Sequence, residues 1–421
     1  MDKDESVRRL PVRAKYISTD VRRTGTLNKL LSAALLALTA IAGAGCAERL
    51  PSLPLALAPE TAPYDIAYSR FYPDSESDQL EKLGRLSIER ERKARSAEAN
   101  DKLPTAHFLA ISGGGDNGAF GAGLMCGWTA RGDRPEFRLI TGVSTGALSA
   151  PFVFLGPEYD HALEQVYTQT SAADIFFPRN KVIAAVAADA VTDSAPLRSM
   201  VTRFIDQRMM QRIAEEYGKG RLLLIMTTNL DQGRPVIWNL GAIAESRHPR
   251  ARELIIDILM ASSAIPGIFP PVMITVSHGG KDFHEMHVDG GTTAQTFLYP
   301  PNFRLKKLGR QKGVERERIA YIIRNGRLFR DEAEVPRQTL SVAAQAASTM
   351  IAANGANDAF RIYLTTRRDG VAYNLAYIGD DFGEPYVGPF DQAYMVKLFS
   401  FGREQGTRGS AWHKAPPGFE N

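Results

Sequence analysis

The pentapeptide GVSTG, from Gly142 to Gly146, has the residue types of a nucleophilic serine turn. Glycines on both sides of Ser144 permit a sharp turn between a strand and a helix, which would expose the serine hydroxyl at the end of a sheet. A helix that begins there also favours negative charge on the serine oxygen. The same five residues can form an ordinary glycine-bounded turn, so the pattern needs support from the rest of the chain.

A glycine-rich segment, residues 112–123, precedes this serine by about 30 positions. Its three consecutive glycines are Gly113, Gly114 and Gly115. Bare backbone N–H groups in such a turn bind anions, so they could form the oxyanion hole that acyl chemistry requires. With Gly118 the segment also fits the G-x-G-x-x-G pattern of dinucleotide sites. Those sites expect an acidic residue at the end of the next strand, where this chain has Ser144, so an oxyanion hole is the favoured interpretation.

A third motif consists of Asp289, Gly290 and Gly291, which follow the strand-like residues MHV. An aspartate beside glycines is most often part of a turn, and alone this motif would indicate no more than that. Its meaning therefore depends on the other two motifs.

Short apolar runs alternate with helical periodicity after residue 104, which predicts an α/β sheet with helices on both faces. We expect strands at His107–Ser112, Phe137–Val143, Arg221–Thr228, Pro235–Trp238 and Ile319–Arg324. We expect helices at Ala147–Leu155, Pro196–Tyr217, Ala251–Ser262, Thr339–Asn354 and Asp391–Arg403. No linker-like stretch divides this region, so residues 104–421 are predicted to form one domain.

Four motifs in this order resemble the patatin family of lipid acyl hydrolases. They are the glycine-rich segment, GVSTG, the segment ASSAIPGIFPP at Ala261–Pro271, and Asp289 with its glycines. DSAPL at Asp193–Leu197 also stands where that family has a similar D-x-x-P-L. The resemblance covers residues 104 to 300, and four ordered motifs are far more specific than one. It implies a three-layer α/β/α sandwich around a mostly parallel central sheet.

The same resemblance implies a serine–aspartate dyad that works without histidine. Ser144 would be the nucleophile, Asp289 the base, and the N–H groups of Gly113, Gly114 and Gly115 the oxyanion hole. Ester cleavage would then pass through an acyl-enzyme that water hydrolyses, and no cofactor is expected. The family usually has Arg or Lys where this chain has Asn117. This departure favours a neutral or small ester, or a lysolipid, over a strongly anionic lipid.

Three other interpretations are compatible with the sequence. A Ser–His–Asp esterase could use His287, which would share a strand face with Asp289, or His413, which alone among the histidines follows it. A lipid-binding protein with a vestigial site is less favoured, because Ser144, Asp289 and the glycines are intact. A nucleotide-binding oxidoreductase lacks the acidic residue for the ribose.

Other potentially reactive side chains favour ordinary structural roles. His278, His284 and His287 are expected to be loop and strand residues, so no metal site is predicted. Cys126 lies in a helical pattern beside Met125 and is expected to be a buried, inert thiol. With 44% apolar and 23% charged residues in 421, the chain has the composition of a globular protein.

The first 45 residues have the features of a targeting segment. A basic stretch precedes the uncharged run Leu30–Gly45, which at 16 residues is short for a membrane span of about 20. These features predict a secretory signal peptide. Cys46 after Gly45 resembles a bacterial lipobox, although Gly43 stands where a large aliphatic residue is usual. We therefore favour a lipoprotein, in which residues 1–45 are cleaved and Cys46 carries a lipid. An ordinary cleaved signal and an uncleaved anchor are the less favoured alternatives.

A lipid on Cys46 would anchor the protein to the bacterial cell envelope, at the outer membrane or facing the periplasm. Residues 46–103, rich in proline and then in charge, are predicted to form a tether and linker. The formal charge of +4 arises from the leader, because residues 46–421 hold 43 basic and 43 acidic residues. The expected partners are therefore a lipid or acyl-ester substrate and a membrane surface, with no nucleic acid; the oligomeric state is left open.

Overall fold

The computed structural model describes residues 49–75, 77–98, 101–178, 190–311, 313–328, 335 and 337–419. A central sheet is the main element of the fold. Nine strands within these ranges form it. They are β1 (Arg70–Phe71), β2 (Ala106–Ile111), β3 (Phe137–Val143), β6 (Leu222–Asn229), β7 (Arg234–Asn239), β8 (Val272–His278), β9 (Lys281–Asp289), β10 (Arg318–Arg324) and β11 (Ala372–Tyr377). Strands β6, β3, β2, β10 and β11 lie side by side and run parallel. Strands β7, β1, β9 and β8 extend the sheet beyond β6 by antiparallel pairing.

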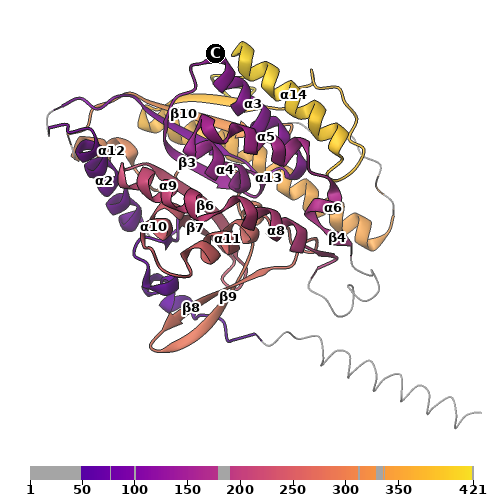
Figure 1. Cartoon of the computed structure of the whole chain (residues 1–421), viewed down its shortest axis with the longest axis horizontal. Helices are drawn as coiled ribbons and strands as arrows, with labels where there is room; N and C mark the ends of the chain where they lie inside the picture. The colour runs from indigo at the N-terminus through magenta and orange to yellow at the C-terminus, as the bar shows by residue number, and fades with distance from the viewer. Residues whose placement is uncertain are drawn as a thin grey trace, which may run out of the picture. The chain divides into compact units, whose positions relative to one another are not determined.

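Helices cover both faces of this sheet (Figure 1). They are α2 (Ser77–Ala94), α3 (Gly118–Arg131), α4 (Thr145–Leu155), α5 (Asp160–Thr168), α6 (Ala172–Ile175), α8 (Ala195–Phe204), α9 (Gln207–Gly218), α10 (Leu240–Glu245), α11 (Ala251–Ser262), α12 (Leu305–Gln311), α13 (Thr339–Asp369) and α14 (Gln392–Arg408). Alternate strand residues enter two separate cores: Leu109 and Ile111 pack in one, Phe108 and Ala110 in the other. This arrangement confirms the predicted three-layer α/β/α sandwich.

Most expected elements are present, with changes at their ends. Strand β3 and helix α11 have the predicted bounds, whereas α13 and α14 run well beyond theirs. The single helix expected at Pro196–Tyr217 is divided into α8 and α9. Ile205 between them has a non-helical ψ of 69°, and the Asp206 side chain caps α9 by accepting the Met209 N–H at 2.7 Å. A capping aspartate inside the periodic run therefore starts a new helix.

The region predicted as a tether and linker is part of the folded domain where it is described. Leu53 and Ala58 are buried in the core, and β1 pairs with β7 at the sheet edge. Helix α2 buries Leu83 beneath its charged outer face. The boundary at residue 104 is therefore corrected: Arg49–Asn421 forms one unit. The reason is that a few apolar residues among prolines and charges suffice to bind the segment to the sheet.

The targeting predictions concern residues that are not described. The predicted signal peptide, residues 1–45, and Cys46 lie outside the described residues. Within the ranges that are described, no helix is long and apolar enough to cross a bilayer.

Candidate active site

Ser144 occupies the turn between β3 and α4 with a backbone conformation that L-residues rarely adopt, φ 54° and ψ −125°. The motif glycines allow the close packing that holds this turn. A Cβ on Gly142 would lie 2.6 Å from the Gly146 carbonyl oxygen, and one on Gly146 would clash with the Ile111 carbonyl. The strained turn places the serine at the carboxyl end of a central parallel strand, where its side chain is presented beyond the sheet.

Asp289 lies beside Ser144 because of the sheet order. It ends β9, where it pairs with Thr227 of β6, and β6 is the neighbour of β3. The Ser144 hydroxyl donates a hydrogen bond to the Asp289 carboxyl group, and the Gly291 N–H donates a second at 2.7 Å. Burial nevertheless dominates and raises the pKa of Asp289 to about 7. The carboxyl group is therefore poised to exchange a proton with the serine near neutral pH.

The glycine-rich segment lies directly against the serine. A Cβ on Gly113 would be 3.1 Å from the Cβ of Ser144. Gly114 and Gly115 have φ of 157° and 59°, and their N–H groups make no hydrogen bond within the described part of the chain. The Gly113 N–H, by contrast, donates to the Gln295 carbonyl at 3.0 Å. The oxyanion prediction is therefore corrected for Gly113, which packs against the nucleophile while its donor is already used.

The remaining motif glycines are sites of close approach. A Cβ on Gly118, Gly290 or Gly291 would clash with the Thr145 hydroxyl, the Met226 carbonyl or the Gln295 amide, respectively. These glycines let α3, β6 and the segment after β9 pack tightly around the serine turn.

Two supporting residues were not identified from the sequence. The Ser262 hydroxyl accepts the Ser144 N–H at 3.0 Å and donates to the Met226 carbonyl at 2.7 Å, so it ties the nucleophile turn to β6. Asn325, which follows β10, donates from its side chain to the Ser112 carbonyl at 2.9 Å and accepts the Gly121 N–H at 3.1 Å. Ser262 lies in the ASSAIP motif and Asn325 directly after a predicted strand. Only these locations in the sequence could have indicated that the two residues support the site.

Asp116 and Asn117 of the glycine-rich segment are held by the C-terminal region. The Asp116 carboxylate accepts the Phe390 N–H at 2.9 Å and a hydrogen bond from the Tyr386 hydroxyl. Burial raises the pKa of Asp116 in spite of these bonds. Asn117 accepts the Tyr394 hydroxyl of α14 at 3.0 Å. The position where a cation is usual in the family is therefore occupied by an amide engaged with α14.

The histidine candidates have partners other than the serine. His287 is fully buried, with Nδ1 2.9 Å from the Thr227 hydroxyl and Nε2 3.2 Å from the Glu285 carboxylate. Glu285 is itself paired with buried Arg70, and its pKa falls to about 2 although burial alone would raise it. His413 exchanges backbone hydrogen bonds with Leu375 on the edge strand β11. Neither imidazole is placed to relay the Ser144 proton.

Cys126 is a free, buried thiol, and the acidic residue Asp380 has a basic partner. The Cys126 thiol is free and buried, and burial raises its pKa to about 12, which leaves it protonated and unreactive. Asp380 pairs with Arg327 at 3.3 Å. Among the described residues, no three His, Cys, Asp or Glu side chains are grouped so that they could hold a metal ion.

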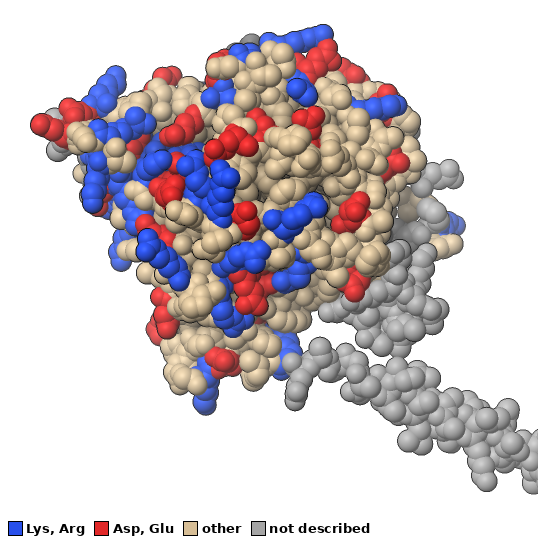
Figure 2. Space-filling view, viewed as in Figure 1, with Lys and Arg blue, Asp and Glu red and all other residues tan. Residues whose placement is uncertain are grey.

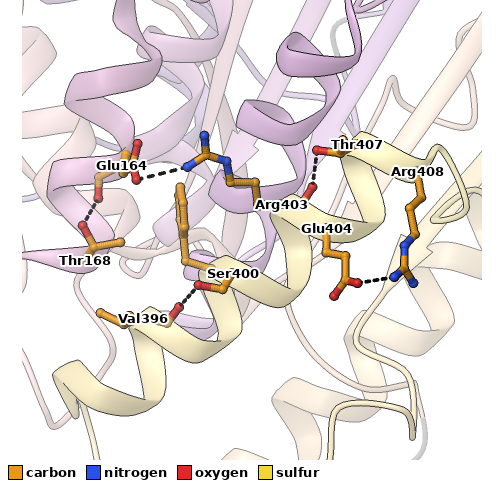
Figure 3. Close-up of a pocket in the computed structure, with 9 residues that line it drawn as sticks. Glu164, Thr168, Val396, Ser400, Arg403, Glu404, Thr407 and Arg408 are labelled. Atoms are coloured by element: carbon orange, nitrogen blue, oxygen red, sulfur yellow. Dashed lines mark hydrogen bonds and ion pairs between the residues drawn. The ribbon is translucent and has the colours of Figure 1, made fainter.

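A surface depression of about 520 Å³ lies between α5 and α14 (Figure 3). Glu164 and Arg403 face one another across it at 3.5 Å. Each hydroxyl group that lines it donates a hydrogen bond to a carbonyl group of its own helix, as Ser400 does to the Val396 carbonyl at 2.9 Å. None of the predicted catalytic residues lines this depression.

Comparisons with known proteins cover the part of the chain that holds this site. The family model described as patatin-like phospholipase matches residues 109–300, a range that includes Ser144, Asp289 and the glycine-rich segment. No curated protein sequence matches the chain. Among solved structures, VipD from Legionella pneumophila matches over 73% of this chain and 67% of its own, with 12% identity and a TM-score of 0.36. That likeness is too distant to carry a functional argument.

Proposed function

Because residues 109–300 belong to the patatin-like phospholipase family, we propose that this protein is a serine lipid acyl hydrolase that uses Ser144 and Asp289 as a dyad. One observation carries the proposal: a serine at a strained strand-to-helix turn donates a hydrogen bond to a buried carboxyl group whose pKa is raised to about 7. A vestigial lipid-binding site would have no need of such a strained serine.

In the proposed reaction the ionised Asp289 accepts the hydroxyl proton as the Ser144 oxygen attacks the ester carbonyl. The tetrahedral oxyanion is stabilised by the N–H groups of Gly114 and Gly115, which have no partner within the described residues. Asp289, now protonated, donates its proton to the departing alcohol. Water then hydrolyses the acyl-enzyme by the same two proton transfers in the same order. A carboxyl group with a pKa near 7 can perform both roles.

The decisive experiment is active-site labelling with a fluorophosphonate probe, which phosphonylates an activated serine. Covalent label on Ser144 in the intact protein, absent from the Ser144→Ala variant, is the expected result. Label on another serine, or none in a folded protein, would contradict the proposal. A panel of phospholipid, lysolipid, monoglyceride and short-chain p-nitrophenyl esters then identifies the substrate class.

The cell-envelope location is a further part of this proposal. It rests on the basic and apolar leader and on Cys46, read from the sequence. Replacing Cys46 by Ser is expected to move the protein from the membrane fraction to the soluble fraction of its cell. Unchanged fractionation would remove the lipid anchor from the proposal and leave the hydrolase assignment intact.

A further inference from the structure

Exposed apolar side chains gather on four segments, residues 172–178, 190–194, 264–270 and 379–391, which we name the apolar rim. These segments hold five of the fourteen exposed large apolar residues found in the described ranges. The five side chains are Phe177, Val191, Ile268, Tyr386 and Val387, and they are 42% to 75% exposed. Such a concentration in so few residues indicates a surface that meets an apolar partner.

Direct contacts join the segments of the apolar rim into one surface. The Val191 N–H donates to the Gly267 carbonyl at 3.1 Å. The Phe176 ring packs against Phe269 and against Phe390, with 6.1 Å between ring centroids in each pair. Segments that are far apart in the sequence are thus held together behind the exposed side chains.

The apolar rim is continuous with both halves of the catalytic site. On one side, the Asp289 N–H donates to the Ala264 carbonyl at 2.9 Å. On the other side, the Asp116 carboxylate of the glycine-rich segment accepts the Phe390 N–H at 2.9 Å. The apolar rim therefore adjoins Asp289 through residues 264–270, and it adjoins the glycine-rich segment through residues 379–391.

The charge of the apolar rim restricts the partner. Its four segments carry six acidic residues and no Lys or Arg: Asp174, Asp193, Asp380, Asp381, Glu384 and Asp391. Two bases outside it, Arg327 and Lys397, pair with Asp380 and Glu384. Residues 179–189, which are not described, add one acid and two bases to the sequence count. The net charge of the apolar rim is negative even when these residues are included, which disfavours binding to an anionic lipid surface.

The visible face of the molecule agrees with this distribution. Lys and Arg gather over α2, α9 and α10, whereas the surface over α5 and α6 is mostly uncharged (Figure 2). Helix α6 belongs to the apolar rim. The basic side chains that could attract anionic lipid are thus gathered over other elements of this face.

We propose that the apolar rim docks the protein on a lipid surface with zwitterionic, choline-bearing head groups. Exposed apolar side chains insert among the lipids, and the carboxylates face the outermost quaternary ammonium groups. Docking in this way brings Ser144 to the ester bonds of the surface. The inference rests on the proposed hydrolase function, since it names the surface on which that site works.

The test uses full-length protein in a Cys46→Ser background, so that the predicted anchor contributes nothing. Val387→Asp and Ile268→Asp place a charge on the apolar rim. Leu230→Asp is the matched control, because Leu230 is 45% exposed in the turn after β6 and Ile268 is 42% exposed. Binding is measured by co-sedimentation with phosphatidylcholine vesicles, and site integrity by hydrolysis of soluble p-nitrophenyl butyrate.

Each rim variant is expected to bind vesicles about tenfold or more weakly while soluble ester hydrolysis is kept, and Leu230→Asp is expected to change neither. Adding phosphatidylglycerol should weaken binding of the background protein. Equal binding by rim and control variants, tighter binding to anionic vesicles, or a dimer that the rim variants dissociate would each overturn the docking inference. Failure of the hydrolase proposal would be seen separately, as no ester hydrolysis and no fluorophosphonate label in the background protein.

Discussion

Two regions of the chain contribute differently to the site. Residues 109–300, which the family model matches, contain the proposed reacting groups, Ser144 and Asp289, and the proposed N–H donors. The region after residue 300 supplies side chains that hold the glycine-rich segment, namely Asn325, Tyr386 and Tyr394. The recognisable motifs therefore contain the proposed reacting groups, whereas the conformation of the glycine-rich segment depends on a region without such motifs. Substitutions in the two regions should differ in size and in kind.

The largest effect is expected from Ser144→Ala. Removal of the attacking oxygen should lower the rate of p-nitrophenyl ester hydrolysis by about ten-thousand-fold or more, with little change in the unfolding temperature. A steady-state assay beside a thermal melt checks both. A variant that keeps the wild-type rate would show that the nucleophile lies elsewhere.

Asp289→Asn should be almost as damaging, by about a thousandfold, because the amide cannot accept the serine proton. The matched control is His287→Gln, which alters a buried ring two residues away and should keep most of the activity. A loss in His287→Gln comparable to that in Ser144→Ala would favour a Ser–His–Asp triad instead.

The wild-type pH profile offers a test without substitution. Only ionised Asp289 can act as the base, so kcat/KM should rise with pH through about 7 and then level off. The stability of the folded protein changes with pH in the opposite direction to the activity. Because the folded pKa is raised, ionising the buried carboxyl group costs stability as pH rises from about 4 through 7. The unfolding temperature of Asp289→Asn relative to wild type should therefore increase over that range.

An intermediate effect is expected in the C-terminal region. Asn325→Ala removes the hydrogen bonds to Ser112 and Gly121 and should lower kcat by about ten- to a hundredfold with little change in KM. A change of the same size in KM alone would mean that Asn325 acts on substrate binding rather than on the conformation of the glycine-rich segment.

The smallest effect should follow from Tyr394→Phe, which removes the hydroxyl group that donates a hydrogen bond to Asn117. We expect a severalfold decrease in kcat at most, since the other bonds of the glycine-rich segment remain. If Tyr394→Phe exceeded Asn325→Ala in its effect, the support of the loop would come mainly from α14.

The layers of the fold could be predicted from the sequence, and so could the side chains proposed to react, whereas the residues that support those side chains could not. Ser144, Asp289 and the glycines lie in motifs whose types and spacing are restricted by the turn and the chemistry. Asn325 and Ser262 act through long-range contacts, which periodicity and local pattern do not encode. The prediction for Gly113 went wrong for the same reason, because its N–H bonds to Gln295, which lies 182 residues later.

The segment 49–98 shows a related limit. Prolines and charges indicated a loose connection, yet Leu53, Ala58 and Leu83 bury enough apolar surface to join it to the domain. Composition averages over a segment, whereas attachment depends on the few side chains that reach the core.

The backbone of Ser144 has one more consequence. The rarely populated φ and ψ of Ser144 cost a serine about 1–3 kcal/mol, most of which a glycine would not lose. Ser144→Gly should therefore unfold at a higher temperature than the wild-type protein while being inactive. Selection for thermostability alone would replace this serine, so a serine at this position is the expected result of a trade-off between stability and the proposed activity.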